Sequence, residues 1–388
     1  MSLALIIALI SFIGWVYLAF FHDAFWQPLT FPLSPEPTTW PEVAIIVPAR
    51  NETDSLPQTL PSWLAQDYKG VWRVILVDDH STDGTAATAR AIAKRLGRED
   101  RLEVIAAPDL PQGWLGKVAA MQAGVAASQS DYILFTDADI RHAPHSLSRL
   151  VARAVEMKLD LTSQMVRLRC VAVAEKLLIP AFVFFFGMLY PFRRANDANH
   201  DMAAAAGGTM LVRRKALQNA GGMAALRNAL IDDCTLARAI KLAGGGADEQ
   251  GLPVKGRIEL TLATDTESLR PYPDIADVWD MVARTAFTQL RYSTAMLAGA
   301  LCGLSLLFLV PPLLPVLSDS AGAGLWAMAA WLLMALIYVP MVMFYKQSPL
   351  WALTLPLAAA IYMAATFDSA LRYWRGQGGL WKGRAQAS

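Results

Sequence analysis

Two carboxylates in the middle of the chain, Asp137 and Asp139, flank a single small residue, Ala138. They directly follow an apolar run at residues 132–135, so both side chains can reach one hard cation. Carboxylate oxygens suit Mg²⁺ or Mn²⁺, and a cation held there would stabilise the departure of a diphosphate leaving group. A pair of acids in a solvated loop is the alternative. The position directly after a predicted buried strand favours the cation site.

Two other charged side chains are placed to contact a nucleotide. Asp79 ends a second apolar run, where a carboxylate can accept hydrogen bonds from a base or a ribose. The S-T-D-G-T segment that follows is also typical of a turn that caps a helix. Lys117 lies at the predicted start of a helix, after the glycine-flanked segment G-W-L-G, where an ammonium can contact phosphate. A solvated surface lysine is the alternative.

A second pair of acids, Asp232 and Asp233, begins another predicted helix. Acids in a first helical turn are stabilised by the helix dipole, which could account for both. A transfer reaction in which a hydroxyl attacks also needs a carboxylate that takes up its proton. Spacing alone does not decide between the two interpretations.

Short apolar runs and helical segments alternate through this region. The runs at residues 43–47, 74–77 and 132–135 each end at proline or polar residues, as buried parallel strands do. Helices are predicted at residues 54–66, 85–96 and 117–128. This order predicts an open α/β sheet with right-handed crossovers, whose ligands bind beyond the carboxyl ends of the strands. The polar clusters fall at those ends, where Pro48, Arg50 and Glu52 form a further one.

The composition excludes some classes of protein. Hydrophobic residues make up 55% of the 388 residues, which is too many for an ordinary soluble protein. The 34 basic residues nearly balance the 33 acidic ones, so the charge does not favour nucleic acid as a partner. The three cysteines are widely spaced, which fits a reducing compartment and argues against a zinc site.

The ends of the chain are predicted to lie in a membrane. Residues 1–22 form an N-terminal anchor without the basic start and cleavage pattern of a removed signal peptide. A proline-rich linker at 23–41 leads to a catalytic domain at 42–275, and further spans are predicted within 294–370. Residues 276–293 fit an interfacial helix or an ordinary connector, and residues 371–388 form a basic tail.

One apolar segment within the catalytic domain, residues 177–192, is too short for a comfortable span. Its aromatic side chains and the two arginines that follow it predict an interfacial segment that meets a lipid acceptor. A buried helix of the catalytic domain is the alternative.

Ordered motifs between residues 43 and 242 resemble the family 2 glycosyltransferases of the GT-A fold. They are V-P-A-R-N-E, V-D-D-H-S-T-D-G-T, G-K-x-x-A-M-Q-x-G, T-D-A-D, G-G-T-M-L-V-R-R and D-D-C-T-L-A-R. The flanking membrane segments are similar to those of the hopanoid-associated glycosyltransferases. The resemblance implies a GT-A open twisted sheet with transmembrane helices at both ends, a nucleotide-diphosphate sugar as donor, a lipid acceptor and a divalent cation.

The resemblance also implies roles for single residues. The nucleotide sugar would be bound by Pro48, Arg50, Glu52, Asp79, Lys117 and Asp137, and the metal by Asp139 with Asp137. Asp233 would be the general base, with Asp232 where the family usually has Glu. Gly207 and Gly208 would lie on the acceptor side.

Processive synthases of this family carry a Q-x-x-R-W motif, and this chain departs from it. Gln289 and Arg291 are its nearest match on the acceptor side, one residue short and followed by Tyr292. The departure argues against polymer synthesis, and the few C-terminal spans favour transfer of one sugar to a lipid. Our hypothesis for the reaction is direct displacement with inversion, and the resemblance implies a role in hopanoid biosynthesis. The alternatives are transfer to a polyprenyl phosphate and a non-catalytic nucleotide-sugar-binding membrane partner. A dehydrogenase is excluded because P-A-R-N-E stands where G-x-G-x-x-G would be needed.

The same resemblance predicts a multi-pass protein of the inner, cytoplasmic membrane whose catalytic domain faces the cytoplasm, where nucleotide sugars are found. Three full C-terminal spans would then place the basic tail outside, against the positive-inside tendency. Either residues 350–367, which include Pro356, form a re-entrant segment, or the tendency does not hold for this chain.

Overall fold

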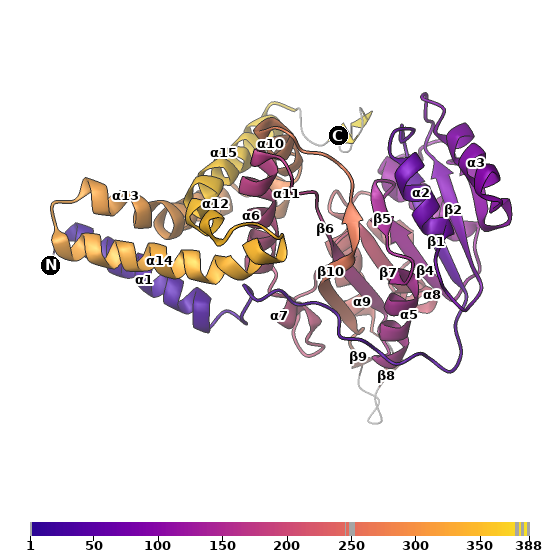
Figure 1. Cartoon of the computed structure of the whole chain (residues 1–388), viewed down its shortest axis with the longest axis horizontal. Helices are drawn as coiled ribbons and strands as arrows, with labels where there is room; N and C mark the ends of the chain where they lie inside the picture. Colours follow the sequence, from indigo (N-terminus) through magenta and orange to yellow (C-terminus); the bar gives the residue numbers. More distant parts are fainter. Residues whose placement is uncertain (1, 245, 248–252, 377–379, 382–383, 386–388) are drawn as a thin grey trace. The chain divides into compact units, whose positions relative to one another are not determined.

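The computed structural model describes residues 2–244, 246–247, 253–376, 380–381 and 384–385. Parts of the predicted basic tail, residues 377–379, 382–383 and 386–388, lie outside the described residues. The chain divides into two compact units (Figure 1). The sheet unit comprises residues 29–168, 194–270 and 381–388, and the helical unit comprises residues 1–28, 169–193 and 271–380.

The sheet unit is built on an eight-stranded sheet with the order β3-β2-β1-β4-β7-β6-β10-β5. Its strands are β1 (Val43–Ala49), β2 (Trp72–Asp78), β3 (Leu102–Ala106), β4 (Tyr132–Thr136), β5 (Ile140–His142), β6 (Leu161–Arg167), β7 (Thr209–Arg213) and β10 (Ile258–Ser268). The predicted strands at 43–47, 74–77 and 132–135 are confirmed as β1, β2 and β4. Strands β1, β2, β3 and β4 are parallel, whereas β7 runs antiparallel to β4 and β6, so the sheet is mixed. Two short two-stranded sheets also occur, one of β8 (Gly246–Ala247) with β9 (Pro253–Val254) and one of β11 (Leu380–Trp381) with β12 (Arg384–Ala385).

Helices cover both faces of this sheet and therefore bury β1 on both sides. Val43, Ile45 and Val47 pack into one core with α2 (Leu56–Leu64), α3 (Thr85–Leu96) and α5 (Ser146–Glu156). Ala44 and Ile46 pack into the other core with α4 (Gly116–Ala126), α8 (Arg214–Asn219) and α9 (Asp232–Ala243). Alternate residues of a strand point to opposite faces, so a continuous apolar run fills both cores.

The α4 helix lies very close to β1. A Cβ added at Gly124 would stand 2.4 Å from Ile46 Cγ2, which is closer than carbon atoms approach. The missing side chain therefore lets the helix that begins at Gly116 rest directly on the central strand and fixes the position of Lys117 in its first turn.

The helical unit holds all the long apolar helices among the described residues. Four are long and apolar enough to cross a membrane: Leu3–Phe20, Thr294–Leu317, Ala321–Phe344 and Pro349–Trp374. They correspond to α1 (Leu3–Phe20), α12 (Thr294–Leu304) with α13 (Val310–Leu317), α14 (Ala321–Phe344), and α15 (Leu355–Trp374) with a preceding 3₁₀ turn. Figure 1 shows α1 beside α14, and these helices are in contact. The predicted fold class, an α/β sheet with apolar helices from both ends of the chain, is confirmed.

Aromatic side chains join the helices of this unit. Trp15 of α1 donates from its indole nitrogen to the Leu307 carbonyl at 2.6 Å and packs edge-on against Phe308. Pro349 and Pro356 each lie in a first helical turn, where proline is tolerated, and whether residues 350–367 form a re-entrant segment stays a prediction. The number of membrane passes and their direction stay predictions.

Residues 177–192 fall mostly in α6 (Val173–Leu189), which belongs to the helical unit and packs against α10 (Ile275–Ala283), α14 and α15. Phe184 is buried against Phe25 and Tyr338. The compact sheet unit therefore leaves out part of the predicted catalytic domain at 42–275. Whether this segment meets a lipid stays a prediction.

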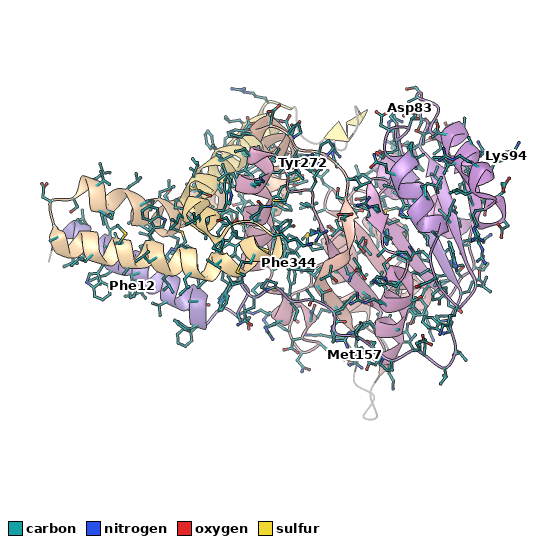
Figure 2. All side chains as sticks on the ribbon, in the orientation of Figure 1. Phe12, Asp83, Lys94, Met157, Tyr272 and Phe344 are labelled. Atoms are coloured by element: carbon teal, nitrogen blue, oxygen red, sulfur yellow. The ribbon has the colours of Figure 1, made fainter. Side chains whose placement is uncertain are left out.

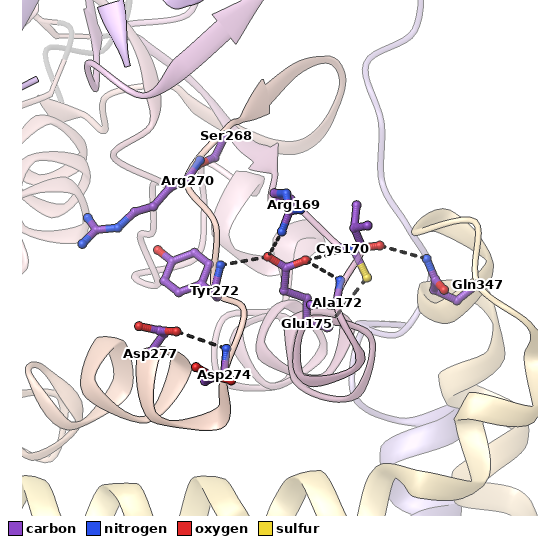
Figure 3. Close-up of polar contacts among 11 residues, drawn as sticks. Arg169, Cys170, Ala172, Glu175, Ser268, Arg270, Tyr272, Asp274, Asp277 and Gln347 are labelled. Carbon is purple, nitrogen blue, oxygen red and sulfur yellow. Dashed lines mark hydrogen bonds and ion pairs between the residues drawn. The ribbon is translucent and has the colours of Figure 1, made fainter. Parts of the chain in front are cut away.

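A fully buried carboxylate marks the start of α6. The two oxygens of Glu175 accept hydrogen bonds from the backbone N–H groups of Val171, Ala172 and Tyr272 at 2.7–2.8 Å. Arg169 donates to the same side chain at 2.6 Å (Figure 3). This carboxylate therefore ties residue 272 to the N-terminus of α6, and its hydrogen bonds offset the cost of burying the charge.

Candidate active site

The candidate catalytic residues gather at one edge of the sheet, which we call the carboxyl edge. Strands β1, β2 and β4 are parallel and end there. Strand β7 runs the other way, and Thr209 at its start pairs with Thr136 at the end of β4. The carboxyl edge therefore collects the segments that follow three strands and the glycines that precede β7.

The predicted nucleotide contacts after β1 and β2 are brought together. Arg50 donates to the Asp79 carbonyl at 2.6 Å, and its guanidinium lies 3.7 Å from the Asp79 carboxylate. Asp79 is 2% exposed and also lies 3.1 Å from His80 Nδ1. Pro48 is buried inside β1, and Glu52 accepts a hydrogen bond from Ser55 at 2.9 Å. This arrangement holds the Asp79 side chain at the end of β2.

The turn after Asp79 caps α3, as the sequence indicated. Asp83 accepts hydrogen bonds from Thr85 and Thr53, which outweigh burial and lower the pKa of its carboxyl to about 2. Lys94 stands in the last turn of the same helix, and Figure 2 labels both residues, one near each end of α3. Both charges complement the helix dipole, so these residues are explained by local structure.

Lys117 lies between two acids that are far apart in the sequence. Its Nζ stands 3.0 Å from Asp137 Oδ1 and 3.5 Å from Asp232 Oδ2, and 20% of its side chain is exposed. Burial disfavours the charged form, but Asp137, Asp232 and Asp233 outweigh it and raise the pKa of Lys117. The side chain is therefore an ammonium ion, and it joins the β4 loop to α9.

Asp139 is held by residues that the sequence did not single out. Ser268, at the end of β10, donates from its hydroxyl to Asp139 Oδ2 at 2.7 Å, and the N–H of Leu269 donates to the Asp139 carbonyl at 2.9 Å. Burial and the charge of Asp137 raise the pKa of Asp139, while Ser268 and Arg270 lower it. Only the strand pairing reveals this contact, because 129 residues separate the two partners.

Asp233 faces the glycines of the predicted acceptor side. Its Oδ2 accepts the N–H of Gly207 at 2.8 Å, and its Oδ1 accepts the N–H of Cys234 at 2.7 Å. Burial and the neighbouring charge of Asp232 raise the pKa of Asp233 to about 6. A carboxylate with this pKa can take up a proton near neutral pH, which is what a general base requires.

A buried polar chain supports the second glycine, Gly208. The Thr136 hydroxyl donates to the Gly208 carbonyl at 3.0 Å, and His142 Nε2 lies 3.0 Å from the same hydroxyl. Burial lowers the pKa of His142 to about 4, so this ring is neutral at physiological pH. A Cβ at Gly208 would stand 3.0 Å from both Val166 methyl carbons, so a larger residue would need the neighbouring strand to shift.

Two predicted acceptor-side residues belong to the helical unit. Gln289 ends α11 (Ala286–Gln289) and donates to the Tyr190 hydroxyl, while Arg291 has a left-handed backbone with φ of 52°. The contacts within each unit do not test the predicted role of Gln289 and Arg291 on the acceptor side, so that role stays a prediction.

The carboxyl edge fits a divalent cation that arrives with a diphosphate. Among the described residues, no group of three or more His, Cys, Asp or Glu side chains forms a complete metal cage. Mg²⁺ is commonly held by one or two carboxylates together with substrate phosphates. Asp137 and Asp139 supply such a pair, and burial together with the charge of Asp137 raises the pKa of Asp139. A cation between them would relieve the repulsion between the two carboxylates.

Part of the chain matches a known protein family. Residues 44–221 match the family model described as "Glycosyl transferase family 2". The dodecaprenyl-phosphate galacturonate synthase of Rhizobium johnstonii is 33% identical over 122 residues, which are 31% of this chain and 34% of that protein. The undecaprenyl-phosphate 4-deoxy-4-formamido-L-arabinose transferase of Pseudomonas aeruginosa is 33% identical over 116 residues, 29% of this chain and 32% of that protein. The chain thus spans about a third of the length of these curated relatives.

The whole fold also has a solved counterpart. The mannosyltransferase PcManGT from Pyrobaculum calidifontis, solved in complex with GDP-Man and Mn²⁺, covers 97% of this chain and 100% of its own, with a TM-score of 0.61 and 18% identity. At this identity the likeness concerns the fold alone.

Proposed function

We propose that this protein, whose residues 44–221 form a family 2 glycosyltransferase domain, transfers a sugar from a nucleotide diphosphate to a polyprenyl phosphate in the membrane. The observation that carries the proposal is the arrangement of the carboxyl edge. There one sheet brings together Arg50 with Asp79, Lys117 with Asp137, and Gly207 with Asp233. A donor site and a base beside it are what direct displacement at an anomeric carbon needs.

The acceptor is chosen from the relatives and from the apolar helices. Both named relatives act on polyprenyl phosphates, which favours this alternative over the hopanoid acceptor that the sequence predicted. Four apolar helices in the described part of the chain fit a lipid substrate. The hopanoid role stays a prediction, and a family domain with glycosyltransferase relatives argues against a non-catalytic binding partner.

We assign the donor to the residues after β1, β2 and β4. Arg50 contacts Asp79, and together with Pro48 and Glu52 it would line the nucleotide site, in which Asp79 would accept hydrogen bonds from the nucleoside. Asp137 and Asp139 would hold Mg²⁺ or Mn²⁺, which when bound neutralises charge on the departing diphosphate. Lys117 supplies a further positive charge next to the same group.

Asp233 serves as the base, with Asp232 beside it. A phosphate monoester loses its second proton at a pH of about 6 in water, and the surrounding carboxylates would raise that value. Within the site the acceptor phosphate would therefore keep a proton, and Asp233, with a pKa of about 6, would accept it as the acceptor oxygen attacks. Attack from the side opposite the diphosphate inverts the anomeric centre. Gly207 and Gly208 leave room there for the acceptor, and Gln289 and Arg291 stay candidates for its lipid side.

We also propose that the protein is a multi-pass protein of the inner membrane, with the sheet unit facing the cytoplasm, where nucleotide sugars are made.

The test measures release of nucleoside diphosphate and formation of labelled lipid by the purified protein in lipid. UDP-glucose, UDP-N-acetylglucosamine, UDP-galacturonate and GDP-mannose are each offered with undecaprenyl phosphate or with a hopanoid, with and without Mn²⁺. We expect transfer to undecaprenyl phosphate that depends on Mn²⁺ and is lost in Asp139→Ala and Asp233→Asn. Transfer to the hopanoid alone would refute the proposed acceptor, and nucleotide-sugar binding without turnover would refute the proposed reaction.

A further inference from the structure

Lys117 is a cation that the protein itself places within the acidic carboxyl edge. Its ammonium contacts Asp137 at 3.0 Å and Asp232 at 3.5 Å, and a Cβ at Gly207 would stand 3.5 Å from it. Asp232 Oδ2 is buried and, among the described residues, accepts no hydrogen bond. The ammonium is thus the charged group that this oxygen faces.

This position conflicts with that of a bound metal. Asp137 is one of the two carboxylates that would hold the divalent cation, and the ammonium already lies at hydrogen-bond distance from it. Two positive ions that share one carboxylate oxygen repel each other, and the repulsion is strong in a partly buried site. A divalent cation can therefore use Asp137 fully only after the ammonium has moved away.

Lysine is suited to such a movement. Its ammonium is a compact charge on a flexible four-carbon stem, and the Lys117 side chain is 20% exposed rather than fully packed. Asp232 offers it a second partner on α9. The diphosphate of a donor would offer a third, because phosphate oxygens accept hydrogen bonds from an ammonium strongly.

We propose that Lys117 is an exchangeable counter-ion, which occupies Asp137 in the ligand-free protein and moves to the donor's diphosphate when donor and metal bind together. The inference rests on the proposed donor and cation sites. Its consequence is that the metal alone binds weakly. By linkage, the nucleotide strengthens metal binding by the same factor as the metal strengthens nucleotide binding.

The test is a titration with Mn²⁺, in which the electron paramagnetic resonance signal of free Mn²⁺ is followed without nucleotide and with UDP or GDP. For Lys117→Met we expect Mn²⁺ alone to bind about tenfold more tightly than to the wild type, because the competing ammonium is gone. Lys117→Arg keeps the charge and should keep the weak binding. Lys94→Met, which removes an exposed charge from α3, is the matched control and should change nothing.

Unchanged or weaker binding of Mn²⁺ alone to Lys117→Met would overturn the inference, and so would tight binding to Lys117→Arg. If Lys117→Met does not fold, the wild type still decides, because tight Mn²⁺ binding that no nucleotide improves contradicts the inference directly. No sugar transfer is measured. A protein that shows the expected Mn²⁺ difference but transfers no sugar therefore refutes the proposed function and leaves this inference standing.

Discussion

The raised pKa of Asp233 predicts how the rate of sugar transfer depends on pH. Burial and the charge of Asp232 raise this pKa to about 6, and the base must be ionised to accept a proton. A carboxyl with this pKa is about one tenth ionised at pH 5 and about nine tenths ionised at pH 7. We therefore expect kcat/KM for the acceptor to rise about tenfold per pH unit well below pH 6 and to stop rising near pH 6, where the free acceptor phosphate also begins to lose its proton.

Two variants should shift the low-pH part of this rate profile, which we call the acid limb, in opposite directions along the pH axis. Asp232→Asn removes the like charge that raises the pKa of Asp233, so the limb should move to lower pH, by about one unit. The ratio of the rate at pH 5 to that at pH 8 would then rise about fivefold. Lys117→Met removes a positive charge that lowers the same pKa, so the limb should move to higher pH.

The assay measures transfer of labelled sugar at saturating donor and Mn²⁺ between pH 4.5 and 8.5. For each variant, the maximum rate and the pH of the acid limb are fitted as separate parameters. Asp131→Asn is the matched control, because Asp131 is exposed and precedes β4, at the end of that strand away from the carboxyl edge. Its limb should coincide with that of the wild type. Shifts of both active-site variants in one direction, or no shift in either, would refute the assignment of the limb to Asp233.

Three further predictions concern positioning and stability. Lys241→Met removes the ammonium that donates to three backbone carbonyls at 2.6–2.8 Å, so thermal unfolding should show that the free energy of unfolding falls by about 2–4 kcal/mol. A fall of less than about 0.5 kcal/mol would contradict this prediction. As the pH falls from 6.5 to 4, His142 should lower the stability of the wild type by up to about 3 kcal/mol relative to His142→Asn, because this imidazole gains its proton in the unfolded state first. Asp233, whose pKa is raised, acts in the opposite direction in both proteins, so the measurement is the difference between their melts across that range. A difference that does not change with pH would exclude His142 as a source of pH dependence. Glu175→Gln places an amide opposite four hydrogen-bond donors and should lower the free energy of unfolding by about 2–4 kcal/mol. Hydrogen exchange at residues 171–176 should become faster. Glu156→Gln on α5 is the control and should change little.

The sequence predicts the half of the sheet that follows simple patterns. Strands β1, β2 and β4 are apolar runs that end at polar residues, and buried parallel strands have that pattern because both faces are covered. The carboxylates Asp79 and Asp137 follow directly from these strands, so their shared edge can be expected from the fold class alone. The predicted helices at 54–66, 85–96 and 117–128 are confirmed as α2, α3 and α4, with ends that differ by up to two residues.

The other half depends on contacts between distant residues, which no local pattern encodes. Ser268 reaches Asp139 only because β10 lies in the same sheet, and Lys117 meets Asp232 only because α4 and α9 cover the same face. The assignment of α6 to the helical unit has a similar origin. Its apolar side chains are equally compatible with a core or a membrane surface, and aromatic packing against α14 and α15 decides in favour of the helical unit.

Charge explains why the proposed site would bind its substrates in order. In the ligand-free protein, the Lys117 ammonium lies among Asp137, Asp232 and Asp233, and Asp139 lies next to Asp137, so the carboxyl edge would repel an anionic acceptor. Asp137 and Asp139 can tolerate the donor's diphosphate only together with a cation, and Lys117 is then drawn toward the phosphates. Asp232 and Asp233 are left as the negative charges nearest the acceptor, and the raised pKa of Asp233 lets it share a proton with an acceptor phosphate instead of repelling it. In the proposed reaction, the same acids would keep the acceptor out before the donor binds and would take its proton afterwards.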